Sequence, residues 1–487
     1  MRDSYALTIS KGMRSMVGMI VTMLAARLME KNSFGTYKQM LLITGFLSSI
    51  ISAGLSTSVS YYYKNMSRDK QKVLITNSLI ISLLISLIST MCIVILKDDI
   101  AQQFNNQNLS LYMFALAVYF FIITFFVFFD NVFISQGKAQ MLSIINIAYT
   151  LTFCMVVGGA IYLKQDIFRI LFSMAAVEFL RGFVLLALCI ASGDVSARAD
   201  WYSLKKQVIY CIPLGLTYLL QSINVYLDKF MVSSYFTPDI YAVYANGTAD
   251  IPFVGMFTIS VVTTALPTFS YMYNTENNKE GVFKLWGELT KNTAVFLYPI
   301  FWVLLFFSQS YILFLYSDKY IASIPIFIVF LMKLPLACTV FGNMLIVMNK
   351  KIYIVYNMAI GIIINIMLNL LLIKPFAMLG AVSAALITQI LLVILQLFQI
   401  HRFSGIKFSQ ILPYGELGKI LLISGIAGAC AYMLSRVINI GVVWNLFVYG
   451  PLTIILAFAF YFLSGITTIN EVLGRVKDHP MKNASKL

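Results

Sequence analysis

Charged side chains are scarce in this sequence. Only 11% of its 487 residues are Asp, Glu, Lys or Arg, whereas 60% are hydrophobic, and the mean hydropathy is +0.85. This composition excludes a soluble multidomain protein, because such a chain could not cover its surface with polar groups. Apolar runs recur along the chain, so the sequence predicts an all-α polytopic membrane protein with about 14 transmembrane helices of about 20 residues each.

Groups for catalysis and metal binding are scarce as well. The two histidines, His401 and His479, lie at a span boundary and in the C-terminal tail, and the six cysteines are scattered without a CxxC pair. No glycine-rich phosphate loop is present, so ATP is not expected as the energy source. We expect no enzyme, no metal and no bound cofactor. The net charge of +15 does not indicate nucleic acid binding, because no soluble stretch is long enough for a binding module.

The predicted spans cover most of the chain. They run near residues 6–29, 39–62, 73–96, 110–134, 140–163, 167–191, 208–234, 240–272, 291–315, 321–346, 352–373, 377–400, 418–437 and 443–464. No signal pattern with a cleavage site precedes the first span, so we expect it to remain in the mature chain. The connections are short, and the function is therefore expected inside the helix bundle.

The distribution of Lys and Arg predicts the orientation. With the N-terminus inside, the inner segments hold 23 of the 35 Lys and Arg residues and the outer segments hold nine. Residues near the ends of a span are counted with the adjoining segment, and the remaining three, Arg181, Lys229 and Lys333, lie deeper within spans. Because cations concentrate on the cytoplasmic side, both termini are predicted to be cytoplasmic.

Three short sequence pairs recur in order at nearly constant spacing. Phe34 and Tyr37 correspond to Tyr241 and Tyr244 at an offset of 207, residues 60–63 to 270–273 at 210, and residues 134–138 to 346–350 at 212. We predict two six-helix lobes, at 1–192 and 208–400, with a cytoplasmic linker at 193–207 and with two further helices and a cytoplasmic tail at 401–487. An even number of helices per lobe implies a pseudo-two-fold axis along the membrane normal. All eleven prolines lie at or beyond Pro213, so bent helices are expected in the second half.

Polar residues follow one face of the seventh span. Gln221, Asn224 and Asp228 lie four, seven and eleven residues after Thr217, and Lys229 follows directly. A charge at the centre of a membrane costs roughly 2.5 to 3.5 kcal/mol, so such residues usually face a bundle interior or a watered cavity. We interpret this face as one wall of a substrate cavity. The alternative is a buried Asp228–Lys229 pair that neutralises itself and fixes helix packing.

The first span carries arginines near both of its ends. Arg14 shares a face with Gly18, where we expect another element to approach closely, and its guanidinium suits a phosphate. Arg27 lies near the outer end. Both are candidate cavity residues, and the alternative is that they snorkel to the interfaces and anchor the helix.

Further charges lie inside later spans. Glu178 and Arg181 are three residues apart, which indicates an intrahelical ion pair that is either structural or faces the lumen. Lys333 lies mid-span, and we expect it to reach a substrate or to pair with Asp228 or Asp250. Asp250 precedes a proline in a glycine-containing stretch, where a helix is expected to open and free backbone groups for a site.

Two other polar features receive structural interpretations. Asp130, near the inner end of the fourth span, is expected at the membrane interface. One face of the eleventh span carries Asn357, Gly361, Asn365 and Asn369. A stripe of polar and small residues is typical of helix packing.

Two stretches carry a resemblance to a known family. ISKGMRSMVGMIVTMLAARLMEKNSFGTYKQMLLI at residues 9–43, NVYLDKFMVSSYFTPDIYAVYA at 224–245 and the 6+6+2 helix plan resemble the multidrug/oligosaccharidyl-lipid/polysaccharide exporter superfamily, and within it the Wzx-type polysaccharide flippases. The resemblance implies an alternating-access bundle that moves an undecaprenyl-diphosphate-linked O-antigen or capsule repeat unit to the outer leaflet of the bacterial inner membrane. It also supports Arg14, Arg27, Asp228 and Lys229 as cavity residues.

The expected partners follow from that resemblance: the polyprenyl-diphosphate oligosaccharide, membrane lipid and the polysaccharide polymerase machinery. Proton or sodium coupling through Asp228 or Asp250 stays open. A cation-coupled multidrug exporter is one rival, although the first span has no acidic residue between Asp3 and Glu30. A lipid II flippase is another rival. A membrane polymerase or acyltransferase is disfavoured, because no large outer loop and no intramembrane histidine is predicted.

Overall fold

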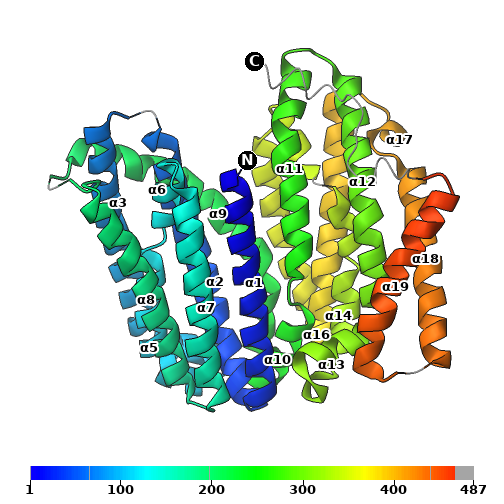
Figure 1. Cartoon of the computed structure of the whole chain (residues 1–487), viewed down its shortest axis with the longest axis horizontal. Helices are drawn as coiled ribbons and strands as arrows, with labels where there is room; N and C mark the ends of the chain where they lie inside the picture. Colours follow the sequence, from blue (N-terminus) through cyan, green and yellow to red (C-terminus); the bar gives the residue numbers. More distant parts are fainter. Residues whose placement is uncertain (1, 65, 197, 340, 439, 467–487) are drawn as a thin grey trace. The chain divides into compact units, whose positions relative to one another are not determined.

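In the computed structural model, all regular structure of the described residues is helical, which confirms the predicted all-α class (Figure 1). The structure describes residues 2–64, 66–196, 198–339, 341–438 and 440–466. The predicted cytoplasmic tail, with His479 and its cations, lies outside these residues.

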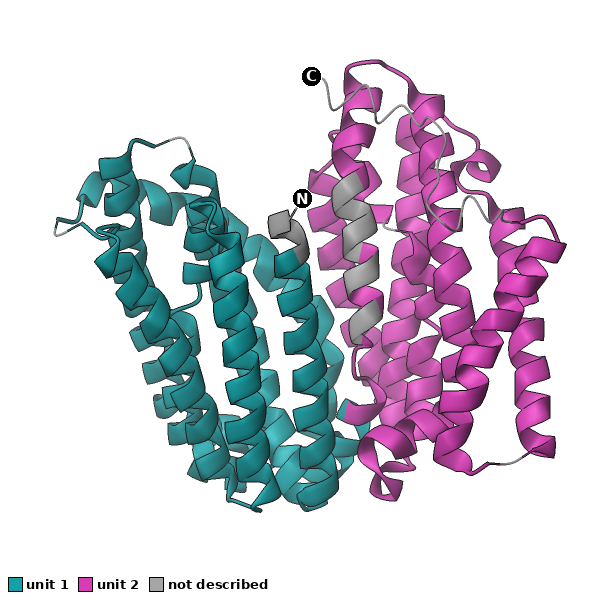
Figure 2. Ribbon diagram, viewed as in Figure 1, with its two compact units in different colours: residues 1–245 teal, residues 246–487 magenta. Residues whose placement is uncertain are grey.

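Packing divides the chain into two compact units, Met1–Ala245 and Asn246–Leu487 (Figure 2). The helices of the first unit are α1 (Arg2–Leu28), α2 (Lys31–Tyr63), α3 (Arg68–Ile95), α4 (Lys97–Gln103), α5 (Asn108–Phe125), α6 (Phe129–Ser135), α7 (Ala139–Tyr162), α8 (Ile167–Ala191) and α9 (Trp201–Tyr235), followed by α10 (Pro238–Gly247), which crosses the boundary. The predicted lobes at 1–192 and 208–400 stay a prediction.

The second unit begins with the end of α10. Its further elements are α11 (Pro252–Asn274), α12 (Lys279–Phe306), α13 (Ser308–Tyr316), η1 (Asp318–Tyr320), α14 (Ser323–Leu331), η2 (Leu334–Cys338), α15 (Phe341–Val347), α16 (Ile352–Ser404), α17 (Phe408–Ile411), α18 (Tyr414–Val437) and α19 (Val442–Leu463).

Among the described residues, 11 helices are long and apolar enough to cross a membrane. The 53-residue α16 counts once, although the backbone of Ala377 (φ 49°, ψ −131°) divides it into two helices beside Pro375. This division agrees with the predicted spans at 352–373 and 377–400. Two other long helices, α1 and α11, are not among the 11. The number of fourteen stays a prediction.

In the first unit, α1 packs along α7 and α2 packs along α9, while α5 lies against α3 and α8. Apolar side chains cover these helices all round, so one side packs inside and the other side suits lipid. On α3, for example, Ile75 and Ile81 are buried, whereas Ile88, Met91 and Ile95 are more than 60% exposed. These packed helices hold the buried polar groups in place.

Three predicted spans are interrupted beside charged residues, and the ninth is interrupted at Phe307, between α12 and α13. The eighth opens at residues 248–251, between α10 and α11, as the sequence predicts for the stretch around Asp250. The tenth breaks between α14 and α15, where η2 holds Pro335. The fourth breaks between α5 and α6, at residues 126–128, although no proline marks the place. The sequence does not predict this third break, and it lies directly before Asp130.

The asparagine stripe of α16 packs helix against helix, as predicted. Asn357 and Gln399 exchange two hydrogen bonds of 2.8 Å across the two halves of α16, and Asn369 donates to Asn365 Oδ1 at 2.8 Å. The stripe residues are buried. Amides that satisfy one another in this way hold two apolar helices in one register.

Candidate functional site

An ionic cluster lies inside the first unit and draws on four helices. Arg14 Nη2 of α1 donates to Glu178 Oε1 of α8 at 3.2 Å. One turn further on α8, Arg181 Nε donates to Asn146 Oδ1 of α7 at 2.9 Å, and Arg181 Nη2 bonds Asp130 of α6. The cluster therefore joins helices that are far apart in the sequence. We call these residues, with Tyr149, the ionic cluster.

The predicted pair of Glu178 and Arg181 exists, but it is the weakest contact of the cluster. Glu178 Oε2 lies 4.0 Å from Arg181 Nη1, whereas each residue has a closer partner on another helix. Tyr149 lies beside both guanidinium groups, with its ring centroid 4.9 Å from Arg14 Cζ and 5.4 Å from Arg181 Cζ. An aromatic face attracts cations and positions both arginines.

Exposure distinguishes the two arginines. The side chains of Arg181 and Glu178 are 8% and 9% exposed, whereas that of Arg14 is 46% exposed. Two cations and two carboxylates balance within the cluster, so it can persist in a low dielectric. Arg14 is the member with room for a further anionic partner.

In the described part of the first unit, Gly18 makes no close contact with another helix, so a close approach at this glycine stays a prediction. Among the described residues, no atom outside the helix lies within 4 Å of the position that a Gly18 Cβ would take. Close helix contact occurs at Gly158 of α7, which faces Leu24 of α1. Arg27 lies 13 residues after Arg14, about 20 Å along the helix, and is half-buried. Arg14 and Arg27 therefore do not share one site.

Asp228 and Lys229 lie in a second cluster of the first unit. Asp228 is buried and accepts a hydrogen bond of 2.5 Å from the Tyr244 hydroxyl of α10. Lys229 Nζ lies 5.6 Å from the ring centroid of Tyr226, and its charge interacts with that of Lys38 on α2. Tyr244 rather than Lys229 is thus the hydrogen-bonding partner of Asp228. The alternative of a self-neutralising Asp228–Lys229 pair lacks support in these contacts.

Two other polar residues that the sequence places on this face, Thr217 and Asn224, bond back to their own helix. Thr217 Oγ1 donates to the Pro213 carbonyl at 3.0 Å, and Asn224 Nδ2 donates to the Leu220 carbonyl at 3.0 Å. Such back-bonding is usual for polar side chains within spans and satisfies part of their polarity. It supports no ligand role for Asn224 by itself.

Two predicted site residues lie in the second unit. Asp250 is exposed in the open stretch before α11. Lys333 lies at the break between α14 and η2, with Nζ 5.2 Å from the ring centroid of Phe330. Its proposed pairing with Asp228 or Asp250 stays a prediction.

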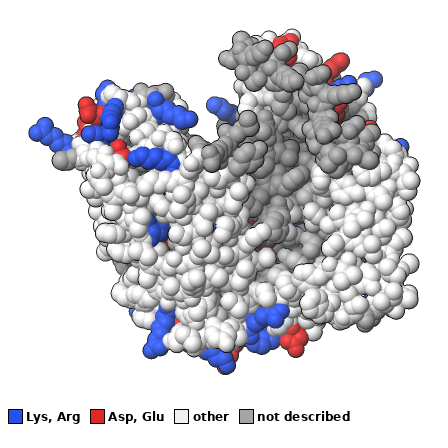
Figure 3. Space-filling view, viewed as in Figure 1, with Lys and Arg blue, Asp and Glu red and all other residues white. Residues whose placement is uncertain are grey.

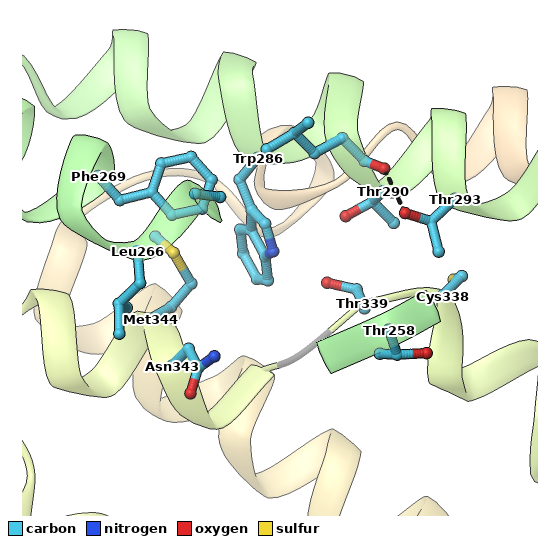
Figure 4. A pocket seen from close by; sticks show the side chains of 12 residues that line it. Thr258, Leu266, Phe269, Trp286, Thr290, Thr293, Cys338, Thr339, Asn343 and Met344 are labelled. Carbon is cyan, nitrogen blue, oxygen red and sulfur yellow. Dashed lines mark hydrogen bonds between the residues drawn. The ribbon is translucent and has the colours of Figure 1, made fainter. Parts of the chain in front are cut away.

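A small cavity of about 40 Å³ lies beside this break (Figure 4). The hydroxyl groups of Thr290 and Thr339 point into the space beside the Trp286 indole, and neither has a hydrogen-bond partner among the described residues. Thr293 instead donates to the Leu289 carbonyl at 2.8 Å. A water needs roughly 10 to 15 Å³ of such volume, so the cavity suits water rather than a sugar or a diphosphate.

The sequence does not identify several members of these clusters. Asn146 and Tyr149 are neutral residues of α7 whose role depends on Arg181 and Arg14, and Asp130 is predicted only as an interfacial residue. Lys38 is predicted in an outer connection, but α2 begins at Lys31 and includes it. The sequence contains one indication that Asn146 and Tyr149 act together: they lie three residues apart and therefore share a helix face.

The comparisons with known proteins agree with this architecture. Residues 1–273, more than half of the chain, match the family model described as polysaccharide biosynthesis protein. The chain belongs to this family. A comparison with curated proteins gave no match.

Solved structures share the fold of this family member. The lipid II flippase MurJ in an inward closed conformation is 16% identical, with a TM-score of 0.75, over 95% of this chain and 99% of that chain. An inward-facing MATE family transporter of the MOP superfamily is 12% identical, with a TM-score of 0.57, over 80% and 96%. The Vibrio cholerae MATE transporter VcmN in its bent form is 9% identical, with a TM-score of 0.54, over 84% and 98%. The predicted membership in the MOP exporter superfamily is confirmed.

Proposed function

We propose that this protein is a flippase for undecaprenyl-diphosphate-linked polysaccharide repeat units, such as those of O-antigen or capsule. It moves them by alternating access from the cytoplasmic to the outer leaflet of the bacterial inner membrane, with both termini in the cytoplasm. Membership in the polysaccharide biosynthesis family supports the link to polysaccharide. The lipid II flippase, whose fold extends over 95% of this chain, supports transport of a lipid rather than catalysis.

The proposal depends mainly on the exposure and the ion pairing of Arg14. It lies near the middle of α1, its side chain is 46% exposed, and its present partner is the buried carboxylate of Glu178. A diphosphate needs cationic partners to enter a low dielectric, and guanidinium binds phosphate oxygens through a rigid fork. Arg14 can exchange one anion for the other without leaving its place beside Tyr149.

The direction of transport agrees with the membrane potential. Outward movement of a negative charge is favoured by an inside-negative potential, by roughly 2.3 kcal/mol per charge per 100 mV. Proton or sodium coupling stays open within this proposal, with Asp228 as its candidate residue. Asp228 is buried and hydrogen-bonded, whereas Asp250 is exposed in an open stretch.

A cation-coupled multidrug exporter is a second candidate, because MATE transporters share the fold. Drug cations favour an acidic cavity, but the sequence of α1 has no acidic residue between Asp3 and Glu30, and the charged residue near its middle is the basic Arg14. A lipid II flippase is the third candidate. Its substrate also carries a diphosphate, so the ionic cluster does not separate it from the proposed function.

The phenotype of a strain that lacks this protein distinguishes the three candidate functions. If the proposal holds, single lipid-linked repeat units accumulate on the cytoplasmic face and surface polysaccharide is lost, and plasmid-borne protein restores export. Arrest of cell-wall synthesis with lipid II accumulation would identify a lipid II flippase. Normal surface polysaccharide with raised sensitivity to cationic dyes would identify a drug exporter.

The predicted cavity lysines supply a second test. Lys229→Ala and Lys333→Ala are expected to reduce export while leaving the amount of protein in the membrane unchanged. Full export by both variants would remove these two lysines from the proposed substrate path.

A further inference from the structure

A polar pocket lies at one end of the first unit, outside the ionic cluster. Its volume is about 340 Å³, and it is bounded by the end of α2, the start of α3, the end of α6 and the segment after α8. The lining residues that matter for its charge are Arg68, Lys72, Gln136, Lys138 and Asp194. We call this the basic pocket.

The charge of the basic pocket is strongly positive. Arg68, Lys72 and Lys138 face a single acidic residue, Asp194. That carboxylate is already engaged, because Asp194 Oδ2 accepts from Lys138 Nζ at 3.3 Å and from Gln136 Nε2 at 3.1 Å. Arg68 and Lys72 thus leave the pocket with an excess of positive charge.

The start of α3 adds to this field. Ser67 occupies its N-cap position but makes no side-chain hydrogen bond to the first turn. The amide groups at the start of a long helix can bind an anion, and the helix dipole favours negative charge there. Asp69 lies in the same turn and offsets part of this effect.

The pocket lies at the ends of long apolar helices, where lipid headgroups are expected. Transmembrane helices end or begin around it, at Tyr63, Arg68 and Ser135. The adjacent Tyr61 and Tyr62 pack against Tyr210 of α9, with ring centroids 4.8 and 5.3 Å apart. Tyrosines of this kind concentrate at membrane–water interfaces. On the face drawn in Figure 3, Lys and Arg gather at the ends of the teal unit of Figure 2, with few charges between.

The second unit carries a contrasting pocket near the start of α12. Its charged residues are Glu280, Lys284, Glu288, Lys291 and Glu416. Acidic residues outnumber basic ones there, and Lys291 is paired with Glu416 at 2.8 Å. Excess positive charge is therefore a property of the basic pocket and not of every polar pocket in this protein.

We propose that the basic pocket binds the phosphate group of a lipid at the membrane interface. Two sources share this chemistry: an anionic phospholipid of the bilayer, or the diphosphate of the lipid-linked substrate on its way into the protein. The second source rests on the proposed function, and the first does not. Basic pockets between transmembrane helices are suited to anionic headgroups, whose phosphate oxygens accept several charge-assisted hydrogen bonds.

Binding of defined lipids to the purified full-length protein in detergent tests the proposal. The probes are dioctanoyl phosphatidylglycerol, dioctanoyl phosphatidylcholine and undecaprenyl diphosphate, with the Kd measured by native mass spectrometry. At least one anionic probe is expected to bind about tenfold more tightly than phosphatidylcholine, the ratio that 1.4 kcal/mol supplies. Equal Kd values for all three probes would overturn the proposal.

Substitutions inside and outside the basic pocket show where the anionic probe binds. Lys72→Gln and Arg68→Gln are expected to raise the Kd of the anionic probe about fivefold to tenfold, as loss of one charge-assisted contact would. Asp194→Asn is expected to lower the Kd, because it removes the acidic residue and releases Lys138. Lys206→Gln, which changes an exposed lysine near the start of α9, is the matched control and should leave the Kd unchanged.

These measurements answer two questions: which lipid supplies the phosphate, and whether the basic pocket is the place that binds it. Tight binding of phosphatidylglycerol alone assigns the pocket to the bilayer, and tight binding of undecaprenyl diphosphate alone assigns it to the substrate. Equal weakening by Lys206→Gln and Lys72→Gln, or no tightening by Asp194→Asn, would contradict a phosphate site at this place. If the deletion strain exports polysaccharide normally, the proposed function fails, whereas phosphatidylglycerol binding that depends on Lys72 would stand.

Discussion

At the scale of single residues, the contact between Arg14 and Glu178 combines a structural role with an exposed cation. Glu178 is buried, and removal of Arg14 leaves it with the Tyr149 hydroxyl and with Arg181, whose Nη1 is 4.0 Å from Glu178 Oε2. A buried charge that loses its partner destabilises a protein by roughly 3 to 5 kcal/mol. Because Arg14 is 46% exposed, water offsets part of this effect, and we expect about 1 to 2 kcal/mol.

Substitution of both residues separates the two roles. Arg14→Gln is expected to lower the melting temperature in detergent and to abolish export, whereas Glu178→Gln is expected to retain export, because Arg14 stays available to the substrate. The double variant Arg14→Gln/Glu178→Gln should regain stability, since no buried carboxylate is left with a missing partner, but it should not regain export. Restored export in the double variant would show that Arg14 serves only to neutralise Glu178.

Sequence analysis finds most of the charged residues in this unit but not their partners. Arg14 and Glu178 are 164 residues apart, whereas Glu178 and Arg181 are neighbours on one helix. Helical periodicity detects only the pair of Glu178 and Arg181, although these two side chains lie farther apart than those of Arg14 and Glu178. The role of Asn146 and Tyr149 depends on which arginines lie against α7, and no pattern within α7 carries that information.

At the scale of helices, breaks without proline are the features that the sequence fails to predict. Pro375 lies near the division of α16 at Ala377, and Pro252 lies at the start of α11 after the open stretch. The break between α5 and α6 has another cause. A Cβ at Gly182 of α8 would lie 2.2 Å from the Phe126 ring, so this glycine makes room for the side chain at the break. The sequence shows the glycine but not its neighbour.

Gly182→Ala is therefore expected to disturb the break and the adjacent Asp130–Arg181 contact. Phe126 is buried and must shift, which costs about 1 to 3 kcal/mol for overpacking of a core. Gly159→Ala on α7 is the matched control, because no atom of the described residues lies within 4 Å of the new methyl group. We expect that control to be stabilising by about 0.4 to 1 kcal/mol. Melting temperatures in detergent test both, and equal effects would contradict this packing.

The start of α9 provides a pH-dependent element. The pKa of Asp200 is lowered because its carboxylate accepts from the Ser203 hydroxyl and from the Ser203 and Tyr202 amides. A group whose folded pKa is lowered stabilises the fold above its unfolded pKa, about 3.9 for Asp, and this contribution is lost as the pH falls through the folded value. Protection of the Tyr202 and Ser203 amides from hydrogen exchange should therefore decrease below about pH 4.

Asp200→Asn is the control for this effect. Asparagine also caps helices but does not titrate in this range, so protection in the variant should not change with pH beyond the intrinsic exchange rate. The same pH dependence in wild type and variant would assign the loss to another group.

At the scale of the whole molecule, the repeat predicted from sequence offsets has a counterpart in the contacts. Asn32 Nδ2 of α2 donates to Asp239 Oδ2 of α10 at 3.0 Å, and these residues are separated by the predicted offset of 207. A Cβ at Gly35 would lie 2.0 Å from the Pro238 carbonyl, so the two segments touch closely. Equivalent residues of two repeats can meet only near the axis that relates them. The axis that relates the two predicted lobes stays a prediction, and this contact is where we expect it to pass.

The predicted orientation is open to a direct test with single cysteines. Positive charge concentrates on the cytoplasmic side, and the inner segments of this chain hold 23 of its 35 Lys and Arg residues. Gln107, before α5, is exposed in a predicted outer connection, and Ser67, before α3, is exposed in a predicted inner one. In a variant without native cysteines, a membrane-impermeant maleimide added to intact cells should label Gln107→Cys but label Ser67→Cys only after the membrane is opened. The reverse pattern would place the basic pocket at the outer surface, where a substrate made in the cytoplasm could not enter through it.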